Sequence, residues 1–329
     1  MKSFIKVFFL CAVVVASSFA FTGCKKESPV ADPSALLQQS IYNLFEVSSL
    51  RYAATLGLDT PVAATGGDVS ADVNVSGAFN HTDKKKSNFD MTVVADAQDE
   101  KGEQYKFDFS MKSVNEKVYI QLLEAPTIPG LAADGFKDFV GPWWQIDTTQ
   151  LGGMGESLNS LDTLGAAESE LSETDKKTRQ LILTSEFFSN IEYEETKDVG
   201  GSPAYVFSVN LNKDGLLKFF KGLAEINGQT PTQQEENDLM GGLSMFDFDG
   251  NISVDVAASV LVGVDGKIIV TDPTTSESGD INVELSVSDL NKPFEIKEPT
   301  DFKVFDLGAF FGAFLGAGMS GGMDAATGE

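Results

Sequence analysis

Few side chains in this 329-residue sequence have the types and spacing that catalysis or metal binding requires. There is one histidine, His81, and it lies in a polar stretch that reads as a solvated turn, 80–83. General acid–base and nucleophilic catalysis need a positioned acid, base or nucleophile, and a Ser-His-Asp arrangement would have to include His81. Zinc sites need several nitrogen or sulfur ligands. The sequence therefore predicts no catalytic residue, no metal site and no cofactor.

Two weaker patterns leave alternatives open. The segment Asp247–Asn251 (DFDGN) faintly resembles a calcium-binding loop, but its glycine stands at the fourth place where such loops need it at the sixth. A turn between two strands is the preferred interpretation. The chain also has 49 acidic residues, and a carboxylate pair for glycoside cleavage forms in space, where sequence spacing does not reveal it. An envelope hydrolase therefore remains a third, trailing hypothesis.

Cys24 is the side chain whose setting predicts a covalent modification. Lys2 and Lys6 precede an uncharged run, Val7 to Phe21, which is shorter than the ~20 residues that a membrane-spanning helix needs. This is the build of a secretory signal peptide. The ending FTGC at 21–24 resembles the bacterial lipobox, in which the cysteine receives diacylglycerol, the preceding peptide is cut, and the new N-terminus is acylated, palmitate being a typical acyl group. We expect an extracytoplasmic protein of the bacterial cell envelope that is anchored to a membrane through diacylglyceryl-Cys24; an ordinary signal peptide cut elsewhere is the alternative.

The charge of the chain excludes one class of partner. The formal net charge is −25, and such a surface repels nucleic acids, whose binding relies on Lys and Arg neutralising phosphates. The acidity fits either a soluble, non-adhesive surface or affinity for cations and basic protein partners. Cys11 leaves with the signal peptide, so the mature chain has only Cys24 and forms no internal disulfide.

The first half of the mature chain predicts one helix followed by an antiparallel sheet. Asp32 and Pro33 form a helix start, with an N-cap acceptor and a proline at the first position, and apolar residues recur at helical spacing up to about Leu50. From Asp68 the apolar period changes to two, which predicts a sheet with one polar and one apolar face. The apolar alternation covers Val69 to Val75, Phe89 to Ala95, Tyr105 to Met111 and Val118 to Leu123, and Trp143 to Asp147 forms a further short strand.

The second half repeats this plan in outline. A helical period returns over 157–189, where Ser172 is the expected N-cap with Asp175 three residues on. A hairpin around Gly200–Gly201 and a helix capped by Asn212 follow, and then a polar segment, Gln229 to Asp238. Three closing strands are expected, at Ile252 to Val256, at Ile268 to Thr271 after a tight turn at Asp265–Gly266, and at Ile281 to Val287.

The predicted organisation is a signal peptide (1–23), a lipidated tether (24–32), one α+β domain (33–306) and a glycine-rich apolar tail (307–329). No linker rich enough in Pro, Gly or Ser to separate two domains lies between the halves. Gly308, Gly312 and Gly316 are four residues apart in the tail, a spacing that lets two helices approach closely in membranes. A short docked helix or a flexible tail is the preferred interpretation.

Three phrases carry a resemblance to a known family. They are WQID at 144–147, GKI at 266–268 and LNKPFEIKEP at 290–299. Together they resemble the lipoprotein-carrier superfamily, which includes lipoprotein localisation factors and mycobacterial glycolipid-carrying lipoproteins. The resemblance implies a curved antiparallel half-barrel with helices packed on its concave face and an apolar cavity between the two layers for acyl chains. The helices at 32–50, 157–189 and 212–226 would then form a lid.

A hydrophobic ligand, an acyl chain or lipid, is accordingly the leading functional hypothesis, with no chemical step. The alternative is a non-catalytic envelope or surface lipoprotein that binds another protein through its acidic surface. The candidate lining residues of the cavity, each of which plain core packing would also explain, are Phe107, Phe109, Phe136, Phe139, Trp143, Trp144, Phe187, Phe188, Phe219 and Phe220.

Overall fold

The computed structural model describes residues 28–62, 67–81, 87–115, 117–128, 136–146, 171–271 and 278–305. The predicted signal peptide, Cys24 and the glycine-rich tail, 307–329, lie outside the described residues. Within the described ranges, no helix is both long and apolar enough to cross a membrane.

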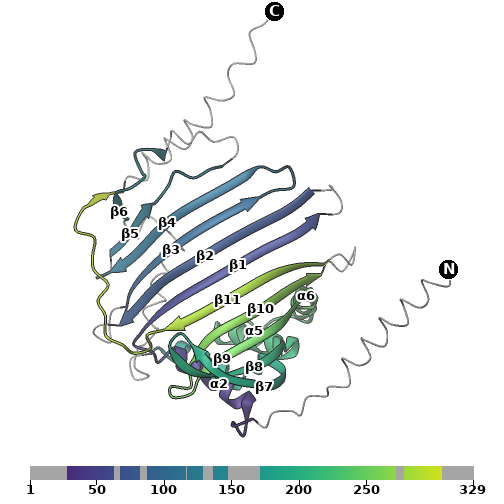
Figure 1. Ribbon diagram of the computed structural model, residues 1–329. Helices are drawn as coiled ribbons and strands as arrows, with labels where there is room; N and C mark the ends of the chain where they lie inside the picture. The colour runs from purple at the N-terminus through teal and green to yellow at the C-terminus, as the bar shows by residue number, and fades with distance from the viewer. Residues whose placement is uncertain are drawn as a thin grey trace, which may run out of the picture.

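The architecture is an α+β fold built on one curved sheet of 12 strands that does not close on itself (Figure 1). The strand order is β12-β6-β5-β4-β3-β2-β1-β11-β10-β9-β8-β7, and neighbours pair antiparallel except β12 and β6, which are parallel. The strands are β1 (Ser49–Val62), β2 (Gly67–His81), β3 (Ser87–Gln98), β4 (Gln104–Val114), β5 (Lys117–Leu122), β6 (Trp143–Ile146), β7 (Phe188–Val199), β8 (Ser202–Leu211), β9 (Phe246–Asp255), β10 (Leu261–Thr271), β11 (Ser278–Ser288) and β12 (Phe302–Val304).

The described part of the chain has four helices, and their starts are set by local capping. They are α2 (Pro33–Leu44), α4 (Glu173–Thr184), α5 (Lys213–Ile226) and α6 (Gln233–Ser244). Asp32, Ser172 and Asn212 accept hydrogen bonds from backbone N–H groups in the first turns of α2, α4 and α5, as the sequence predicts. These side chains satisfy donors that a helix start leaves without partners.

Three elements were missing from the sequence-based prediction: β1, α6 and the short strand β12. The expected first helix ends early, at Leu44. Residues from Ser49 onward form β1, which lies near the centre of the sheet and pairs with β2 along its whole length. The segment read as polar, Gln229 to Asp238, contains the start of α6, where Thr232 and Glu235 form a reciprocal capping box. Polar composition concealed this helix because it lies at the surface and has no fully buried residue.

Three further predictions were wrong, two of them because strands run through the expected turns. Asp265–Gly266 lies inside β10, and Asp247–Asn251 lies inside β9, where the two glycines of these segments face each other across the ladder. Close approach of the two backbones explains the glycines, since a Cβ on Gly266 would lie 2.7 Å from the Cα of Gly250. Strand β11, expected to close the sheet, lies at its centre and joins β10 to β1.

His81 is also not in a solvated turn. It ends β2 with 8% of its surface exposed, and its backbone N–H donates to the carbonyl oxygen of Ser48 over 2.7 Å. The segment that leads into β1 therefore covers the end of β2 at this corner of the sheet.

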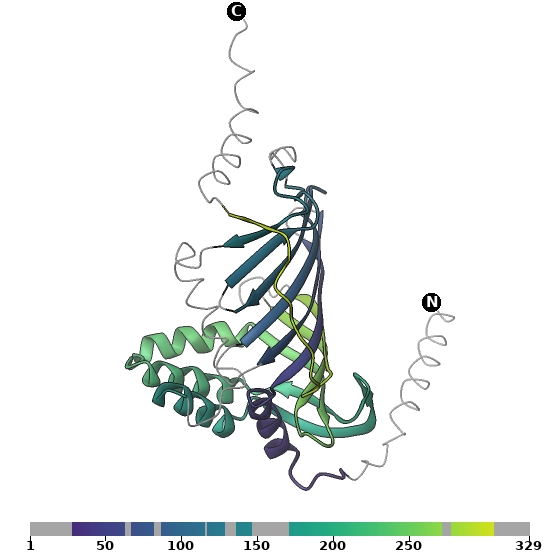
Figure 2. The ribbon, with the colours of Figure 1, turned by 90° about the vertical axis from the view of Figure 1, so that its left-hand side faces the viewer.

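The helices pack side by side and against one end of the sheet. Contacts run from α2 to α4, from α4 to α5 and from α5 to α6, and the main helix contacts with the sheet are those of α2 with β7 and β10 and of α6 with β9. Figure 2 shows the helices beside the β7–β11 end, with β2 to β6 extending beyond them. The main core lies at this end, where Leu37 of α2 packs with Phe207, Ile252 and Val254.

A long segment after β11, Asp289 to Asp301, crosses the ends of the strands to reach β12 beside β6, and we call it the strap (Figure 1). Ser49 donates to the carbonyl oxygen of Lys292 over 2.7 Å, and Asn80 donates to that of Phe294 over 2.7 Å. Further along, Glu298 accepts hydrogen bonds from Lys117 and Tyr119. The strap thereby connects β1, β2 and β5 at the same end of these strands.

Candidate functional site

The strand register gives the sheet one apolar face, on the side of the helices. Successive residues of a strand point to opposite faces, and Val264 and Leu285 of β10 and β11 pack against the core beneath α2. Their partners across the ladder belong to the same face. The rows on this face run Leu285–Ala54–Val75–Val93–Phe109–Leu122 and Val283–Leu56–Val73–Ala95–Phe107.

The apolar face continues beyond the part that the helices cover. Leu285 belongs to the core under α2, whereas Leu122 and Phe109 belong to a second apolar cluster at the far side of the sheet. Between them the strands β1 to β4 present apolar side chains that are only partly buried, and Leu56 and Phe107 remain 40% and 42% exposed. An apolar strip about four strand spacings wide, roughly 19 Å, therefore joins the two clusters.

The second cluster lies where β4, β5 and β6 meet the segment before β6 and Phe305, which follows β12. Phe136 and Phe139 are buried there with Leu122, and Trp144 stacks at 5.3 Å from the Phe139 ring, with its indole N–H donating to the Phe139 carbonyl oxygen over 3.1 Å. Phe109 packs on the same cluster, and its ring centre lies 5.2 Å from that of Phe107. Five of the ten predicted lining residues thus come together at one end of the apolar strip.

The other predicted lining residues lie elsewhere. Phe187, at the start of the β7 hairpin, and Phe219 of α5 meet with ring centres 5.1 Å apart, and Phe220 lies next to them, 41% exposed. Phe188 packs on the core under α2. Trp143 points to the polar face, where the Lys112 ammonium lies 5.1 Å from its ring centre.

Leu56 is a surface residue of this strip that sequence reasoning missed, because β1 was not predicted. The signal was present: Leu50, Tyr52, Ala54, Leu56 and Leu58 alternate with residues that are polar or small, which is the period of a strand. The helical pattern before Leu50 hid the point at which the period changes.

The chemistry of this surface is that of apolar contact. In the described ranges, no group of three or more His, Cys, Asp or Glu side chains is placed to hold a metal ion. The titratable group closest to the strip with a strong shift is Tyr52, whose pKa burial and the charge of Asp90 raise to about 12. It is therefore a neutral hydrogen-bond donor at physiological pH.

No protein-family model matches the chain, and no curated protein matches it. Among solved structures, the chain is similar to LprF from Mycobacterium bovis, at 12% identity and a TM-score of 0.35 over 82% of this chain and 98% of that one. It is also similar to the Mycobacterium tuberculosis lipoprotein LppX, at 14% identity and a TM-score of 0.32 over 81% and 100%. A third similar structure is MucB in complex with MucA(peri), at 9% identity and a TM-score of 0.22 over 84% and 63%. These values describe a loose likeness of fold.

Proposed function

We propose that the protein binds an acyl chain or another hydrophobic ligand on the apolar strip of β1 to β4, between the two apolar clusters. The observation that supports this proposal is the exposure of Leu56 and Phe107 in one register row of an otherwise apolar face. Exposed apolar area in contact with water is unfavourable by about 25 cal/mol per Å², and contiguous patches of it mark binding surfaces.

The strip suits an elongated ligand. Its two ends are the buried clusters around Leu37 and Leu122, and its middle carries small or branched side chains such as Ala95 and Val73. An extended hydrocarbon chain lying along a row would cover the exposed part of Leu56 at one side and Phe107 at the other. Binding would involve no bond making or breaking.

The proposal includes the anchor predicted at Cys24. A diacylglyceryl group and an N-acyl chain on this residue supply the two signals that stable membrane attachment requires. The tether up to Pro33 is short, so α2 and the apolar face would be held close to the membrane surface. Hydrophobic ligands would then enter from the bilayer or leave to it.

The test uses the chain from Cys24 onward, produced without the predicted signal peptide. This protein is not acylated at Cys24, so it is purified without detergent. A dansyl-labelled undecanoic acid is titrated and its fluorescence recorded, and lipids extracted from the purified protein are identified by mass spectrometry. We expect saturable binding of the probe. Phe107→Asp and Leu56→Asp should each weaken it more than about tenfold, because a carboxylate loses hydration when a hydrocarbon covers it.

The matched control is Asn74→Asp. Asn74 is exposed, lies next to Val73 on the opposite face, and accepts a hydrogen bond from Thr55 through an oxygen that aspartate retains. The Asn74→Asp substitution adds the same negative charge as Phe107→Asp and Leu56→Asp to the same region, but on the face opposite the strip. The affinity for the probe should therefore stay within about twofold of the parent's. Absence of probe binding in the parent, or equal loss in all three variants, would contradict the proposal and favour a protein partner.

A further inference from the structure

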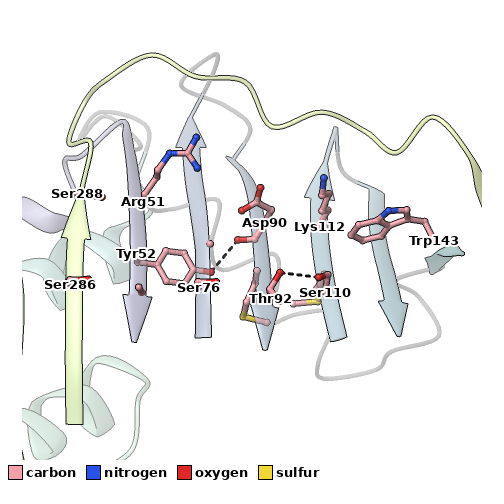
Figure 3. A pocket seen from close by; sticks show the side chains of 14 residues that line it. Arg51, Tyr52, Ser76, Asp90, Thr92, Ser110, Lys112, Trp143, Ser286 and Ser288 are labelled. Carbon is pink, nitrogen blue, oxygen red and sulfur yellow. Dashed lines mark hydrogen bonds between the residues drawn. The ribbon is translucent and has the colours of Figure 1, made fainter. Parts of the chain in front are cut away.

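The opposite, polar face of the sheet carries a hollow of about 620 Å³ across β11, β1, β2, β3, β4 and β6 (Figure 3). Pockets of about 300–1,000 Å³ are the usual size for small-molecule sites. Its charged, serine and threonine side chains alternate along each strand with those of the apolar strip, so these groups lie on the opposite side of the same strands. Tyr52, Gly77, Met91 and Met111, which also line the hollow, are in step with the strip residues. A ligand in the hollow would be separate from one on the strip.

One row of the hollow is built from charged and aromatic groups. Asp90 of β3 stands directly opposite Lys112 of β4 in the ladder, and the Lys112 ammonium lies 5.1 Å from the ring centre of Trp143 on β6. At the other side, Arg51 of β1 pairs with Asp289 of the strap at 3.3 Å. Figure 3 shows Arg51, Asp90, Lys112 and Trp143 in one line across the strands.

A second row, two residues along each strand, consists of hydroxyl groups. Ser76, Thr92 and Ser110 are neighbours on β2, β3 and β4, and Ser286 lies on β11 at the same level. The Thr92 and Ser110 hydroxyls are hydrogen-bonded to each other at 2.9 Å. Each hydroxyl both donates and accepts, so this row offers both kinds of hydrogen bond to a ligand.

We propose that this hollow is a second binding site, specific for a neutral saccharide. Sugar hydroxyl groups donate and accept in equal measure, which matches a carboxylate acceptor, two cationic donors and a row of serine and threonine hydroxyls. The aromatic face of Trp143 carries negative charge density and attracts the weakly positive C–H groups of a sugar ring.

Two features favour a neutral ligand over an anion. Asp90 lies between Arg51 and Lys112 in the row, and the Arg51 charge is already compensated by Asp289. The hollow also belongs to a chain with a formal net charge of −25. Phosphate or a carboxylate would therefore meet no net positive field, whereas a neutral polyol needs none.

The test is isothermal titration calorimetry on the chain from Cys24 onward with maltotriose, cellotriose, tri-N-acetylchitotriose and inorganic phosphate. We expect saturable heat with at least one of the three saccharides and none with phosphate. In that case Asp90→Asn and Trp143→Ala should each lower the affinity at least tenfold. In a Trp144→Phe background, Trp143 is the sole tryptophan, and its fluorescence should change in step with the heat.

The matched control is Asp72→Asn, which makes the same charge change on an exposed residue farther along the same face. It should leave saccharide affinity unchanged, as should Phe107→Asp on the apolar strip. Phe107→Asp distinguishes the two proposals. If this variant loses affinity for the acyl probe but keeps its affinity for the saccharide, the two ligands bind at separate sites. Saturable binding of phosphate, no binding of any of the three saccharides, or equal losses in Asp90→Asn and Asp72→Asn would overturn the proposal. Circular dichroism spectra establish that each variant is folded.

Discussion

The hydroxyl of Tyr52 on β1 donates a hydrogen bond to the backbone carbonyl oxygen of Asp90 on β3 over 3.2 Å, across the intervening strand β2. Gly77 is the β2 residue opposite Tyr52. A Cβ atom there would lie 2.6 Å from the Tyr52 hydroxyl oxygen and 2.1 Å from the Asp90 carbonyl oxygen. Because the second of these contacts is to backbone, no change of rotamer relieves it, and the Tyr52 crossing depends on the glycine.

Gly77→Ala is therefore expected to lower the free energy of unfolding by roughly 1–3 kcal/mol, the cost of overpacking a tight site. Tyr52→Phe, which loses only the hydrogen bond, should cost about 0.5–1.5 kcal/mol. Urea unfolding followed by circular dichroism measures both. The control is Gly57→Ala on β1, where a Cβ would have no atom nearer than 3.4 Å; a loss there as large as that of Gly77→Ala would refute the steric explanation.

Alkaline pH should destabilise the protein through two tyrosines. Burial and the charge of Asp90 raise the pKa of Tyr52 to about 12, and burial, the hydrogen bond to Glu298 and the charge of Glu298 raise the pKa of Tyr119 above its usual value. In the unfolded chain both titrate near 10. Between these values the unfolded state binds fewer protons, so the stability is fully present below about pH 10 and falls as the pH rises through about 12.

Urea midpoints measured from pH 8 to pH 12 would record this fall, and spectroscopic titration of tyrosinate absorbance at 295 nm would follow the ionisation directly. The Tyr52→Phe variant should show a shallower decline than the parent over the same range. Equal slopes in the two proteins would mean that Tyr52 ionises in the folded state as it does in solution.

Arg179 of α4 connects the row of packed helices, α2, α4, α5 and α6, to the segment between α2 and β1. It is buried, pairs with Glu46 and lies 5.7 Å from the ring centre of Phe45. Glu46→Gln weakens the pair while leaving the guanidinium buried, so hydrogen exchange of the α4 amides should accelerate. Arg179→Met removes the buried charge and keeps an apolar stem, and it should accelerate exchange less. The opposite ranking would show that the helix row does not depend on compensation of this charge.

Cys24→Ser should abolish acylation at the predicted lipobox, because a serine hydroxyl does not replace the thiol as the acceptor of diacylglycerol. In a bacterial host, the parent protein should incorporate labelled palmitate and fractionate with membranes. The variant should incorporate none and leave the membrane fraction. A variant that still carries label or remains membrane-bound would show that the anchor lies elsewhere.

Local sequence was sufficient for the features that depend on neighbours in the chain. Helix starts at Asp32, Ser172 and Asn212 follow from side chains that cap the next three residues, and the hairpin at Gly200–Gly201 follows from two residues at positive φ. The alternation of Phe107 and Phe109 with polar residues likewise indicated one apolar face. The fold class, a curved antiparallel sheet with helices on one face, could be predicted from these patterns together with the resemblance.

Only the tertiary structure decided which strands pair and what each face carries. Nothing in the alternation of β11 reveals that it pairs with β1, about 230 residues earlier in the chain, because strand order depends on long-range burial that periodicity does not encode. The pairings among β1, β2, β3 and β4 bring Leu56 and Phe107 into one row and, on the reverse side, line up Arg51, Asp90 and Lys112. Asp265–Gly266 was misread for the same reason: a local turn signal is overridden when a neighbouring backbone, here that of Gly250, occupies the space beside the glycine.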